Sequence, residues 1–402
     1  FEVYQGTADL YQYFIEQGMR LLNENGLFHY IVSNKWMRAN YGKPLREWMQ
    51  QYQIESIIDF GDLPVFEEAT TYPCLLQIRK DELQQEFEAV EIEHLEFDSL
   101  QSVIEEFSFQ VDQTKLNTSG WSLISKEAQQ LLEKIKSNGV PLKEYVDGKI
   151  YRGILTGLNK AFVIDEEKRN ELIEDDPNSA QFIKPFLAGR DIKRYQPPTT
   201  DKYLINIPNG WTNKNFKVDV DKWELLQEKF PTLANYLSQY EERAKSRYDQ
   251  GEYWWELRAC TYLKEFEKPK IIYPNICIRP EFTFDTSKQY TNQKCFIISL
   301  DDKALVGILN SKVMSFFFVT VLPKLRGDYF EPSFIYMKDF SIPLQKSQAY
   351  KELTDKLNQI LTAKKSNPGA DTSEMEAEID RLVYELYGLS EEEIEIVEGS
   401  VS

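Results

Sequence analysis

The sequence feature that most constrains the fold is an alternation of amphipathic helix and apolar strand over the first hundred residues. Apolar residues at helical spacing predict a helix over 8–26 and a shorter one over 44–52. Short apolar runs at 27–33, 54–61 and 74–80 predict buried strands. Helices that alternate with such strands are typical of a mostly parallel α/β sheet. Only two or three strands precede a change of pattern, so we expect half of a doubly wound domain.

The rest of the sequence follows other patterns. An alternating run at 90–97 predicts a strand with one wet face, and 125–139 predicts a capped helix. From there to about residue 343, short apolar runs, many prolines and glycines and clustered aromatics predict a mixed α/β region with long loops. Amphipathic segments at 350–366 and 374–390 predict a helical hairpin.

The net charge of −18 is concentrated in two blocks. Residues 81–107 hold ten acidic residues and no Lys or Arg, while residues 371–402 hold eleven acidic residues and one Arg. Each block therefore contributes −10, which leaves +2 for the rest of the chain. Acidity as a whole does not exclude a nucleic-acid partner. We expect the first block to be a solvated face and linker, and the Glu run at 391–398 to be a frayed tail.

Composition excludes several classes of protein. With 42% hydrophobic and 13% aromatic residues, the chain is too apolar to be disordered over most of its length. Four Cys without a CxxC pair and two His predict neither a disulfide framework nor a metal site. The longest apolar run, 313–322, is too short to span a bilayer. We expect no membrane contact, no obligate protein partner and a cytoplasmic location. We interpret the opening on Phe1 as that of a fragment or a processed chain.

The segment 151–165 combines two glycines, which permit tight or left-handed backbone, with polar side chains ahead of an apolar run. A guanidinium can bind guanine through O6 and N7, and an Asn amide can bind adenine through N6 and N7. We therefore predict that this segment faces DNA. Its candidate contact residues are Arg152, Thr156, Asn159 and Lys160.

Further basic residues are candidates for contact with the DNA backbone, because phosphate contacts dominate nonspecific affinity. They are Lys35 and Arg38 after the predicted strand at 27–33, Lys193 and Arg194, Lys270, and Lys324 and Arg326. Solvated surface charges or internal ion pairs are the alternative interpretation for several of these residues.

Eight stretches, taken in order, carry a family resemblance. They are YQGTADLYQYFIEQGMRLLNENGLFHYIVSNKWMRANYGKPLREWM (4–49), IESIIDFGDLPVFEEATTYPCLLQIRK (54–80), YRGILTGLNKAFVID (151–165), FIKPFLAGRDIKRY (182–195), KPKIIYPNI (268–276), LVGILNSKVMSFFF (305–318), DFSIP (339–343) and EIDRLVYELYGLSEEEIEIVE (378–398). The first two resemble the second half of the N6-adenine DNA methyltransferases of the TaqI and Eco57I type. The next five resemble that family's target-recognition domain, and the tail resembles the C-terminal helices of type IIG restriction–modification enzymes.

The resemblance implies transfer of a methyl group from S-adenosylmethionine to adenine N6 in double-stranded DNA, after the base is flipped out. Phe66 matches the position that packs against the flipped adenine, and a core aromatic that anchors its loop is the alternative. The family's Asn-Pro-Pro-Tyr motif and glycine-rich cofactor loop are absent from the sequence. Both precede Phe1 in the family order. We therefore expect cofactor binding and methylation in a longer parent protein, and no activity from this chain alone.

The predicted fold class is α/β: a partial doubly wound methyltransferase sheet, a mixed α/β target-recognition domain and a C-terminal helical element. The predicted boundaries are 1–110, 120–343 and 344–402. The predicted function is DNA target recognition within an adenine-specific methyltransferase of a restriction–modification or phage-defence system. Two alternatives stay open: a non-catalytic DNA specificity module similar to a type I specificity subunit, and an acidic protein-interaction scaffold that binds no DNA.

Overall fold

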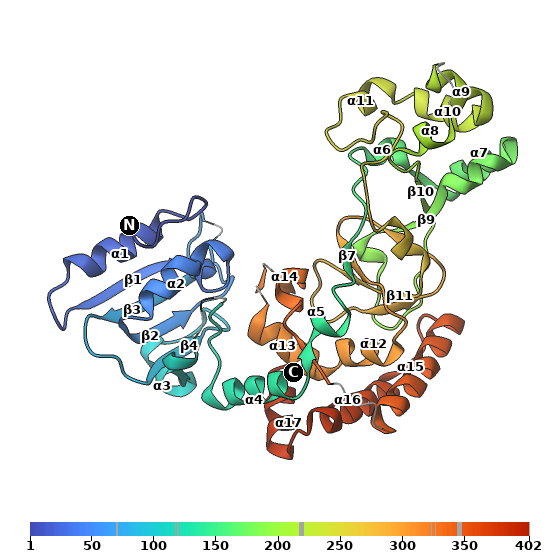
Figure 1. The fold of residues 1–402 in the computed structure, drawn as a ribbon. Coiled ribbons are helices and arrows are strands. Elements are labelled where there is room, and N and C mark those ends of the chain that lie inside the picture. Colours follow the sequence, from blue (N-terminus) through green and yellow to red (C-terminus); the bar gives the residue numbers. More distant parts are fainter. Residues whose placement is uncertain are drawn as a thin grey trace.

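A computed structural model describes most of the chain: residues 1–69, 71–116, 118, 120–216, 221–322, 324–325, 327–343 and 348–401. Figure 1 shows a sheet with helices around the N-terminus, a lobe of small sheets and helices at the opposite side, and helices between and below them. We call these parts the N-terminal unit (1–123), the outer lobe (153–269) and the helical core, which comprises the remaining described residues. The C-terminus lies beside the helical core (Figure 1).

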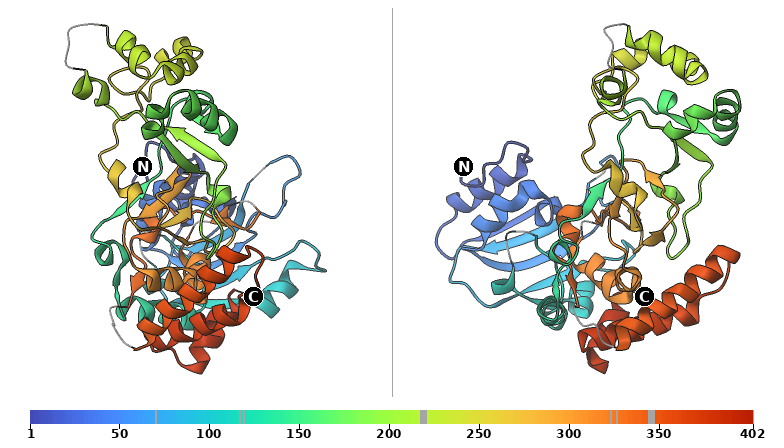
Figure 2. Two further views of the ribbon diagram at one scale, coloured as in Figure 1. Left: turned by 90° about the vertical axis from the view of Figure 1, so that its right-hand side faces the viewer. Right: turned by 45° about the vertical axis from the view of Figure 1, so that its right-hand side comes forward.

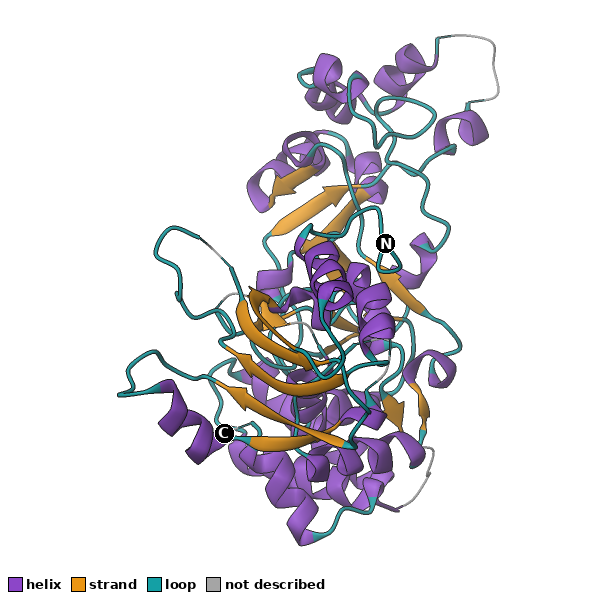
Figure 3. Cartoon of the chain, turned by 90° about the vertical axis from the view of Figure 1, so that its left-hand side faces the viewer, coloured by secondary structure: helices purple, strands orange, loops and turns teal. Residues whose placement is uncertain are grey.

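The N-terminal unit contains a five-stranded sheet of order β1-β3-β2-β4-β5 (Figure 3). Its strands are β1 (Leu27–Ser33), β2 (Gln53–Asp59), β3 (Pro73–Arg79), β4 (Glu86–Glu91) and β5 (Phe109–Asp112). Its helices are α1 (Tyr11–Leu21), α2 (Lys43–Met49) and α3 (Leu100–Phe107), with the 3-10 helices η1 (Asn34–Met37), η2 (Asn40–Gly42) and η3 (Gln113–Lys115). β1, β2 and β4 point in one direction, whereas β3 and β5 run the opposite way.

The prediction of a mostly parallel sheet is wrong. Of the four neighbouring strand pairs, only β2 and β4 are parallel. β3 follows β2 through a loop over 60–72 whose described residues form no crossover helix. A parallel return needs such a crossover, so β3 comes back antiparallel between β1 and β2.

β1 lies at an edge of the sheet and is not buried as predicted. Leu27 and Ile31 are exposed on it. α1 buries Ile15 and Met19 completely, while its other face leaves Phe14 exposed. As an edge strand, β1 presents unpaired backbone groups, and the outer face of α1 presents apolar side chains beside them. Together they form a surface on which a further strand could add to the sheet.

The acidic block at 81–107 is part of the N-terminal unit and not a linker, because it contains β4 and α3. The strand predicted at 90–97 is shifted, since β4 ends at Glu91. Within β4, Phe87, Ala89 and Val90 are buried, and Glu86 and Glu88 alternate with the first two. Because Val90 is buried on the side of Glu86 and Glu88, both faces of the strand are partly covered, and the acids occupy its less buried positions.

The helical core is built mainly from segments distant in sequence. Its N-terminal part holds α4 (Lys126–Ser137), β6 (Val140–Pro141) and α5 (Leu142–Tyr145). Its later part holds α12 (Lys303–Asn310), α13 (Lys312–Val321), β15 (Lys324–Leu325), β16 (Tyr329–Phe330), α14 (Phe334–Met337), β17 (Ser341–Ile342), α15 (Gln348–Ser366), α16 (Ser373–Tyr387) and α17 (Glu391–Gly399). β17 pairs with β6, and α15 and α16 pack against α12 (Figure 2).

Among the described residues, no single helix is long and apolar enough to cross a membrane. α12 and α13 meet that criterion only as a pair bent by 55°. Both are buried in the helical core, with side chains such as Leu305, Ile308, Phe316 and Phe317 almost inaccessible.

The terminal Glu run is not a frayed tail, since it forms α17. Ser390 and Glu393 make a capping box: Ser390 Oγ accepts from the Glu393 N–H (3.3 Å), and the Glu393 carboxylate accepts from the Ser390 N–H (2.7 Å). Lys134 of α4 forms an ion pair with Glu393 (2.5 Å), and Val397 is fully buried. Capping and burial together hold a segment that its charge alone would leave in solvent.

The outer lobe and its junction with the core contain two four-stranded sheets, of order β12-β11-β14-β7 and β13-β9-β10-β8. Their strands are β7 (Ile150–Arg152), β8 (Val163–Asp165), β9 (Ile183–Leu187), β10 (Lys202–Ile205), β11 (Lys270–Pro274), β12 (Thr283–Asp285), β13 (Tyr290–Thr291) and β14 (Cys295–Ile298). The helices are α6 (Asn159–Phe162), α7 (Glu166–Asp175), α8 (Trp211–Asn215), α9 (Lys222–Lys229), α10 (Pro231–Ser238) and α11 (Glu241–Lys245), with the 3-10 helices η4 (Pro177–Phe182), η5 (Gly189–Asp191) and η6 (Leu263–Glu267). An aromatic-rich cluster that includes Phe182, Trp254 and Trp255 forms the lobe's own hydrophobic core.

Candidate functional site

The loop between β2 and β3 carries Phe66. It begins at the carboxyl end of β2, which points the same way as β1, whereas β3 is antiparallel to both. At its start, Asp59 Oδ1 accepts hydrogen bonds from the Gly61 N–H (3.0 Å) and from Asn34 Nδ2 (2.7 Å). Burial raises the pKa of Asp59, against the lowering effect of these two bonds. Gly61 has a φ of +54°, the left-handed region that glycine adopts without strain. Phe66 is 44% exposed, so it is not a core aromatic and its ring can meet a ligand.

Arg38 does not face solvent as predicted. Its guanidinium donates to the carbonyls of Val319 (3.3 Å) and Leu322, in and just after the last turn of α13. Burial lowers the pKa of Arg38. The structure contradicts a phosphate contact here, because the cation already caps the negative end of a helix. Lys35, by contrast, is exposed, with its ammonium 4.9 Å from the centre of the Tyr72 ring.

The hairpin formed by β15 and β16 links the helical core to the loop between β2 and β3. The Gly327 N–H donates to Asp62 Oδ2 of that loop (2.9 Å). Lys324 is exposed at the start of the hairpin and forms a 3.1 Å ion pair with Asp328. Arg326 lies outside the described residues. The hairpin therefore places a basic side chain on an element that touches the loop of the exposed aromatic.

The segment 151–165 begins on β7, where Arg152 is exposed and its Nε donates to the Gln293 carbonyl (2.8 Å). Its first glycine, Gly153, runs against neighbouring backbone: a Cβ there would lie 1.9 Å from the carbonyl oxygen of Asn292. Gly157 has a φ of +69°. Gly153 is thus required because the neighbouring backbone leaves no room for a Cβ, and Gly157 because its backbone is left-handed.

The polar residues that follow divide into one buried and two exposed side chains. Thr156 is buried and not available to DNA as predicted, because its hydroxyl donates to Asn159 Oδ1 (2.5 Å) and accepts from the Leu158 N–H (3.2 Å). Asn159 and Lys160 are exposed at the start of α6. Thr156 therefore orients Asn159 and does not itself reach outward.

Arg247 lies beneath this segment, and no pattern in the sequence indicates its role. It is buried and donates to the carbonyls of Thr156 (2.5 Å), Trp254 (2.9 Å) and Glu256. Its guanidinium also lies 4.2 Å from the centre of the Phe162 ring. Burial lowers the pKa of Arg247 to about 10. A basic side chain in a polar stretch is ordinarily solvated, so only its three-dimensional contacts identify it as the support of the segment.

Lys270 is wrongly predicted to contact DNA. It is fully buried in β11, where its ammonium donates to the Phe266 carbonyl (2.6 Å) and forms an ion pair with Asp285. Burial lowers the pKa of Lys270, while the Asp285 charge opposes that change. Asp285 also accepts from the backbone N–H groups of Ser287 (2.7 Å) and Gln289 (2.9 Å). The pair therefore joins β11 to β12 inside the sheet of order β12-β11-β14-β7 and is structural.

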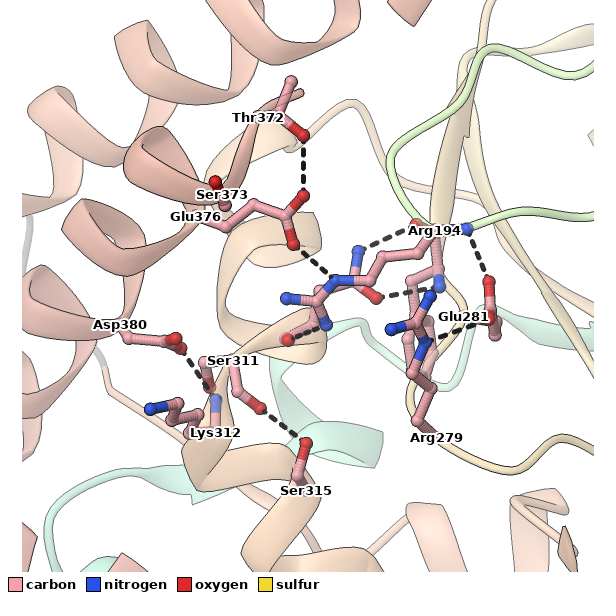
Figure 4. Close-up of polar contacts among 12 residues, drawn as sticks. Arg194, Arg279, Glu281, Ser311, Lys312, Ser315, Thr372, Ser373, Glu376 and Asp380 are labelled. Atoms are coloured by element: carbon pink, nitrogen blue, oxygen red, sulfur yellow. Dashed lines mark hydrogen bonds and ion pairs between the residues drawn. The ribbon is translucent and has the colours of Figure 1, made fainter. Parts of the chain in front are cut away.

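Arg194 is likewise engaged inside the protein (Figure 4). Its Nε pairs with Glu376 of α16 (2.8 Å), its Nη1 donates to the Asn310 carbonyl, and its backbone N–H donates to Glu281 (2.6 Å). The prediction of DNA contact is contradicted, because these contacts tie the segment after η5 to the C-terminal helices. The neighbouring Lys193 is exposed.

Six of the predicted DNA-contacting side chains therefore remain available to a ligand on the described surface. They are Lys35, Arg152, Asn159, Lys160, Lys193 and Lys324. The described residues contain no group of three or more His, Cys, Asp or Glu able to hold a metal ion. Cations and an amide on irregular segments are suited to phosphate and base-edge contacts, and the exposed Phe66 is suited to stacking.

Comparison with known proteins connects these features. Residues 1–66 match the Eco57I restriction-modification methylase family, and residues 184–343 match the TaqI-like C-terminal specificity domain. Type II methyltransferase M.BstVI of Geobacillus stearothermophilus is 23% identical over 420 residues, covering 98% of this chain and 70% of that protein. Type II methyltransferase M.PaeR7I of Pseudomonas aeruginosa is 23% identical over 411 residues, covering 98% and 67%.

The type IIL restriction-modification enzyme MmeI, solved in complex with DNA, shares the fold with a TM-score of 0.65 at 11% sequence identity. That match covers 98% of this chain and 52% of MmeI, so the chain spans about half the length of the solved enzyme. The predicted α/β fold class, with several sheets in separate parts of the chain, is confirmed. The family resemblance is confirmed as well: the chain matches the Eco57I methylase and TaqI-like specificity-domain models and is similar to type II methyltransferases over nearly its whole length.

Proposed function

We propose that this chain is the C-terminal part of a site-specific adenine-N6 DNA methyltransferase of a restriction–modification or phage-defence system, and that its own task is recognition of the DNA target. The observation that carries the proposal is the exposed ring of Phe66 on a sheet loop that contacts the β15–β16 hairpin, which carries the exposed Lys324. Type II methyltransferases among the relatives support the class of reaction.

In this proposal the duplex lies against the exposed cations, and the target adenine leaves the base stack. Lys35, Arg152, Lys160 and Lys193 neutralise phosphates, which fixes the position of the protein on the duplex. Asn159, oriented by Thr156, is placed to contact a base edge. Phe66 stacks on the flipped adenine and so offsets part of the cost of unstacking it.

The residues present do not fit the methyl donor, S-adenosylmethionine. β1 leads directly into η1, and the sequence has no glycine-rich loop after a strand of the first sheet. We derive no step through the cofactor. The unfilled edge of β1 and the exposed apolar face of α1 support the proposal that a complementary half-domain, which holds the cofactor site, packs there. The functional divisions of this chain in the proposal are 1–110, 120–343 and 344–402. This chain alone is therefore expected to transfer no methyl group to DNA.

The test is a fluorescence-anisotropy titration of the chain with short duplexes at several salt concentrations. Phosphate contacts release counterions, so log affinity falls with log salt by about 0.9 per contact. Replacing Arg152 and Lys160 by alanine should weaken binding and reduce that slope by about 2. The matched control replaces Lys351 and Lys365, exposed cations of α15, and should leave both quantities unchanged.

Two outcomes would contradict the proposal. One is binding that does not depend on salt. The other is an equal loss of affinity in both double variants, which would mean that only overall charge matters. A Phe66→Ala variant separates recognition from base flipping: it should retain duplex affinity within about threefold while losing the fluorescence rise of a 2-aminopurine placed at the target adenine.

A further inference from the structure

Two isoleucines and a tyrosine of the helical core have exposed side chains on adjoining segments. Ile276 and Ile278 follow β11, and Tyr329 lies in β16. Their exposed fractions are 51%, 56% and 45%, at least as high as the 44% of Phe66. We call these three side chains the apolar face. Single exposed apolar side chains are common, but neighbouring ones form a patch of the kind that marks an interaction site.

The backbone that carries the apolar face is fixed by the core beneath it. Cys277 and Phe330 form an antiparallel bridge, in which the Cys277 N–H donates to the Phe330 carbonyl (3.2 Å) and the Phe330 N–H donates to the Cys277 carbonyl (2.7 Å). Both side chains are buried in the hydrophobic cluster of the helical core, while the neighbouring Ile276, Ile278 and Tyr329 are exposed. Since β-branched side chains have few rotamers, the two isoleucines lose little freedom when a partner covers them.

The apolar face lies between two parts of the proposed DNA-binding surface. On one side, the N–H of Asn275 donates to the carbonyl of the exposed Lys294 (2.8 Å), and the carbonyl one residue earlier binds Arg152. On the other side, β16 belongs to the hairpin that contacts the loop of Phe66. In the proposed function, a duplex that contacts both parts therefore meets the apolar face between them.

The side chains around the apolar face suit a phosphate backbone. Arg279 is next to the face in sequence and forms a 3.3 Å ion pair with Glu281 (Figure 4). Arg279 is the exposed member of this pair, whereas Glu281 is largely buried and also accepts a backbone N–H (2.6 Å). Lys294 and Lys324 are exposed as well, the second in a surface pair with Asp328. Because surface pairs contribute little to stability, phosphates can replace these carboxylates at small cost.

We propose that Ile276 and Ile278 enter the base stack of bound DNA as an apolar wedge, with Tyr329 beside them, at the gap that the flipped adenine leaves. This inference rests on the proposed function, because it needs a duplex on this surface. Isoleucine is among the side chains that enter base steps and partly unstack them, and its burial offsets the cost of unstacking. A second copy of the chain is a less suitable partner, since three side chains cover much less than the roughly 800 Å² per partner of a standard protein interface.

The test compares two short duplexes that differ at one position, where one of them carries an abasic site. That position lacks the base that would otherwise have to unstack, so a wedge enters it at lower cost whatever the sequence. Burial of two half-exposed isoleucines corresponds to roughly tenfold in affinity, so the chain should bind the abasic duplex about tenfold more tightly. The double variant Ile276→Ser, Ile278→Ser should reduce this preference to within about twofold and leave the salt slopes unchanged, because an isoleucine releases no counterions.

Three controls accompany this variant. Leu83→Ser with Leu95→Ser removes two exposed leucines of the N-terminal unit and should keep the full preference. Phe66→Ala should also keep it, since an abasic position has no base on which the Phe66 ring could stack. Hydrogen exchange of the Cys277 and Phe330 amides should be unchanged in the isoleucine variant, which verifies that the bridge is intact.

The outcomes separate the wedge from the proposed function. Salt-dependent binding with equal affinity for the two duplexes, or a preference that the isoleucine variant retains, overturns the wedge and leaves the proposed function standing. Absence of salt-dependent binding to either duplex contradicts both. Sedimentation velocity tests the other occupant: a dimer that the isoleucine variant converts to a monomer would assign the apolar face to a second copy of the chain and overturn the proposal.

Discussion

Replacing Arg247 with methionine should loosen the segment 151–162, although Arg247 itself is buried beneath it. Methionine keeps an unbranched apolar stem but removes the donors that hold the carbonyls of Thr156, Trp254 and Glu256. The Glu256 carbonyl retains the Gly251 N–H as a donor (3.2 Å), so two carbonyls lose the donor that holds them.

The magnitude follows from those two carbonyls. A buried group left without its partner costs about 1–3 kcal/mol, and removal of a buried charge offsets part of this, so we expect a net loss of about 2–4 kcal/mol. Because the chain has several hydrophobic cores, this loss is best measured locally and not from one unfolding transition. A loss of 2 kcal/mol accelerates hydrogen exchange by roughly 30-fold where exchange proceeds through local opening.

Hydrogen exchange with mass spectrometry provides the assay. The amides of Ile154, Ala161 and Phe162 are hydrogen-bonded to backbone carbonyls and should be the ones that lose protection. Arg247→Lys keeps a charge and some donors and should show an intermediate effect. Arg243→Met, at an exposed position four residues earlier, is the control and should change nothing. Unchanged protection of these amides in Arg247→Met would refute the assignment of Arg247 as the support of the segment.

Three other changes test the contacts described above. Lys270→Met should destabilise the region around β11 by about 3–5 kcal/mol, and adding Asp285→Leu should recover part of that loss, because a buried pair costs most when one partner remains alone. Hydrogen exchange of the β11 and β12 amides in the single and double variants measures this, and strictly additive losses would contradict it. Ser390→Ala should cost about 1 kcal/mol by removing the capping box, seen as faster hydrogen exchange in α17 and nowhere else. Hydrogen bonds from Lys268 and then Ser299 lower the pKa of Glu265, so its contribution to stability is present above the unfolded pKa of about 4.3 and is lost as pH falls through the lower folded value. Glu265→Gln should therefore reduce the loss of hydrogen-exchange protection around η6 below pH 4.5, and an unchanged loss would show that Glu265 does not contribute.

Local patterns in the sequence predicted local structure well. The strand at 27–33 is found at those residues, and the helix expected over 125–139 is α4, with Ser125 as its capping residue. The direction of β3 was mispredicted, because a run of apolar residues does not record which way its strand points. Direction depends on the connecting loop, and no helix forms among the residues that the structure describes between β2 and β3.

The candidate site was less predictable because charge alone does not reveal a partner that is distant in sequence. Lys270 and Lys193 both lie among basic and aromatic residues in the sequence. In the structure Lys270 is paired with Asp285 in the interior, whereas Lys193 is exposed. Arg194 meets Glu376, 182 residues later. The α17 helix was missed for a related reason: its acidic residues were visible in the sequence, but the burial of Val397 was not.

The routing of the outer lobe has a consequence for how such a protein could change. The segment 153–269 leaves the sheet after β7 and rejoins it at β11, and these two strands flank β14. Two strand spacings separate exit from re-entry, or about 10 Å. A module whose ends lie so close together can be exchanged for another of different length without rerouting the surrounding chain. This arrangement lets evolution, or a protein engineer, replace the lobe as a cassette while the first sheet keeps its contacts, with Arg194 retained because it pairs with Glu376 of α16.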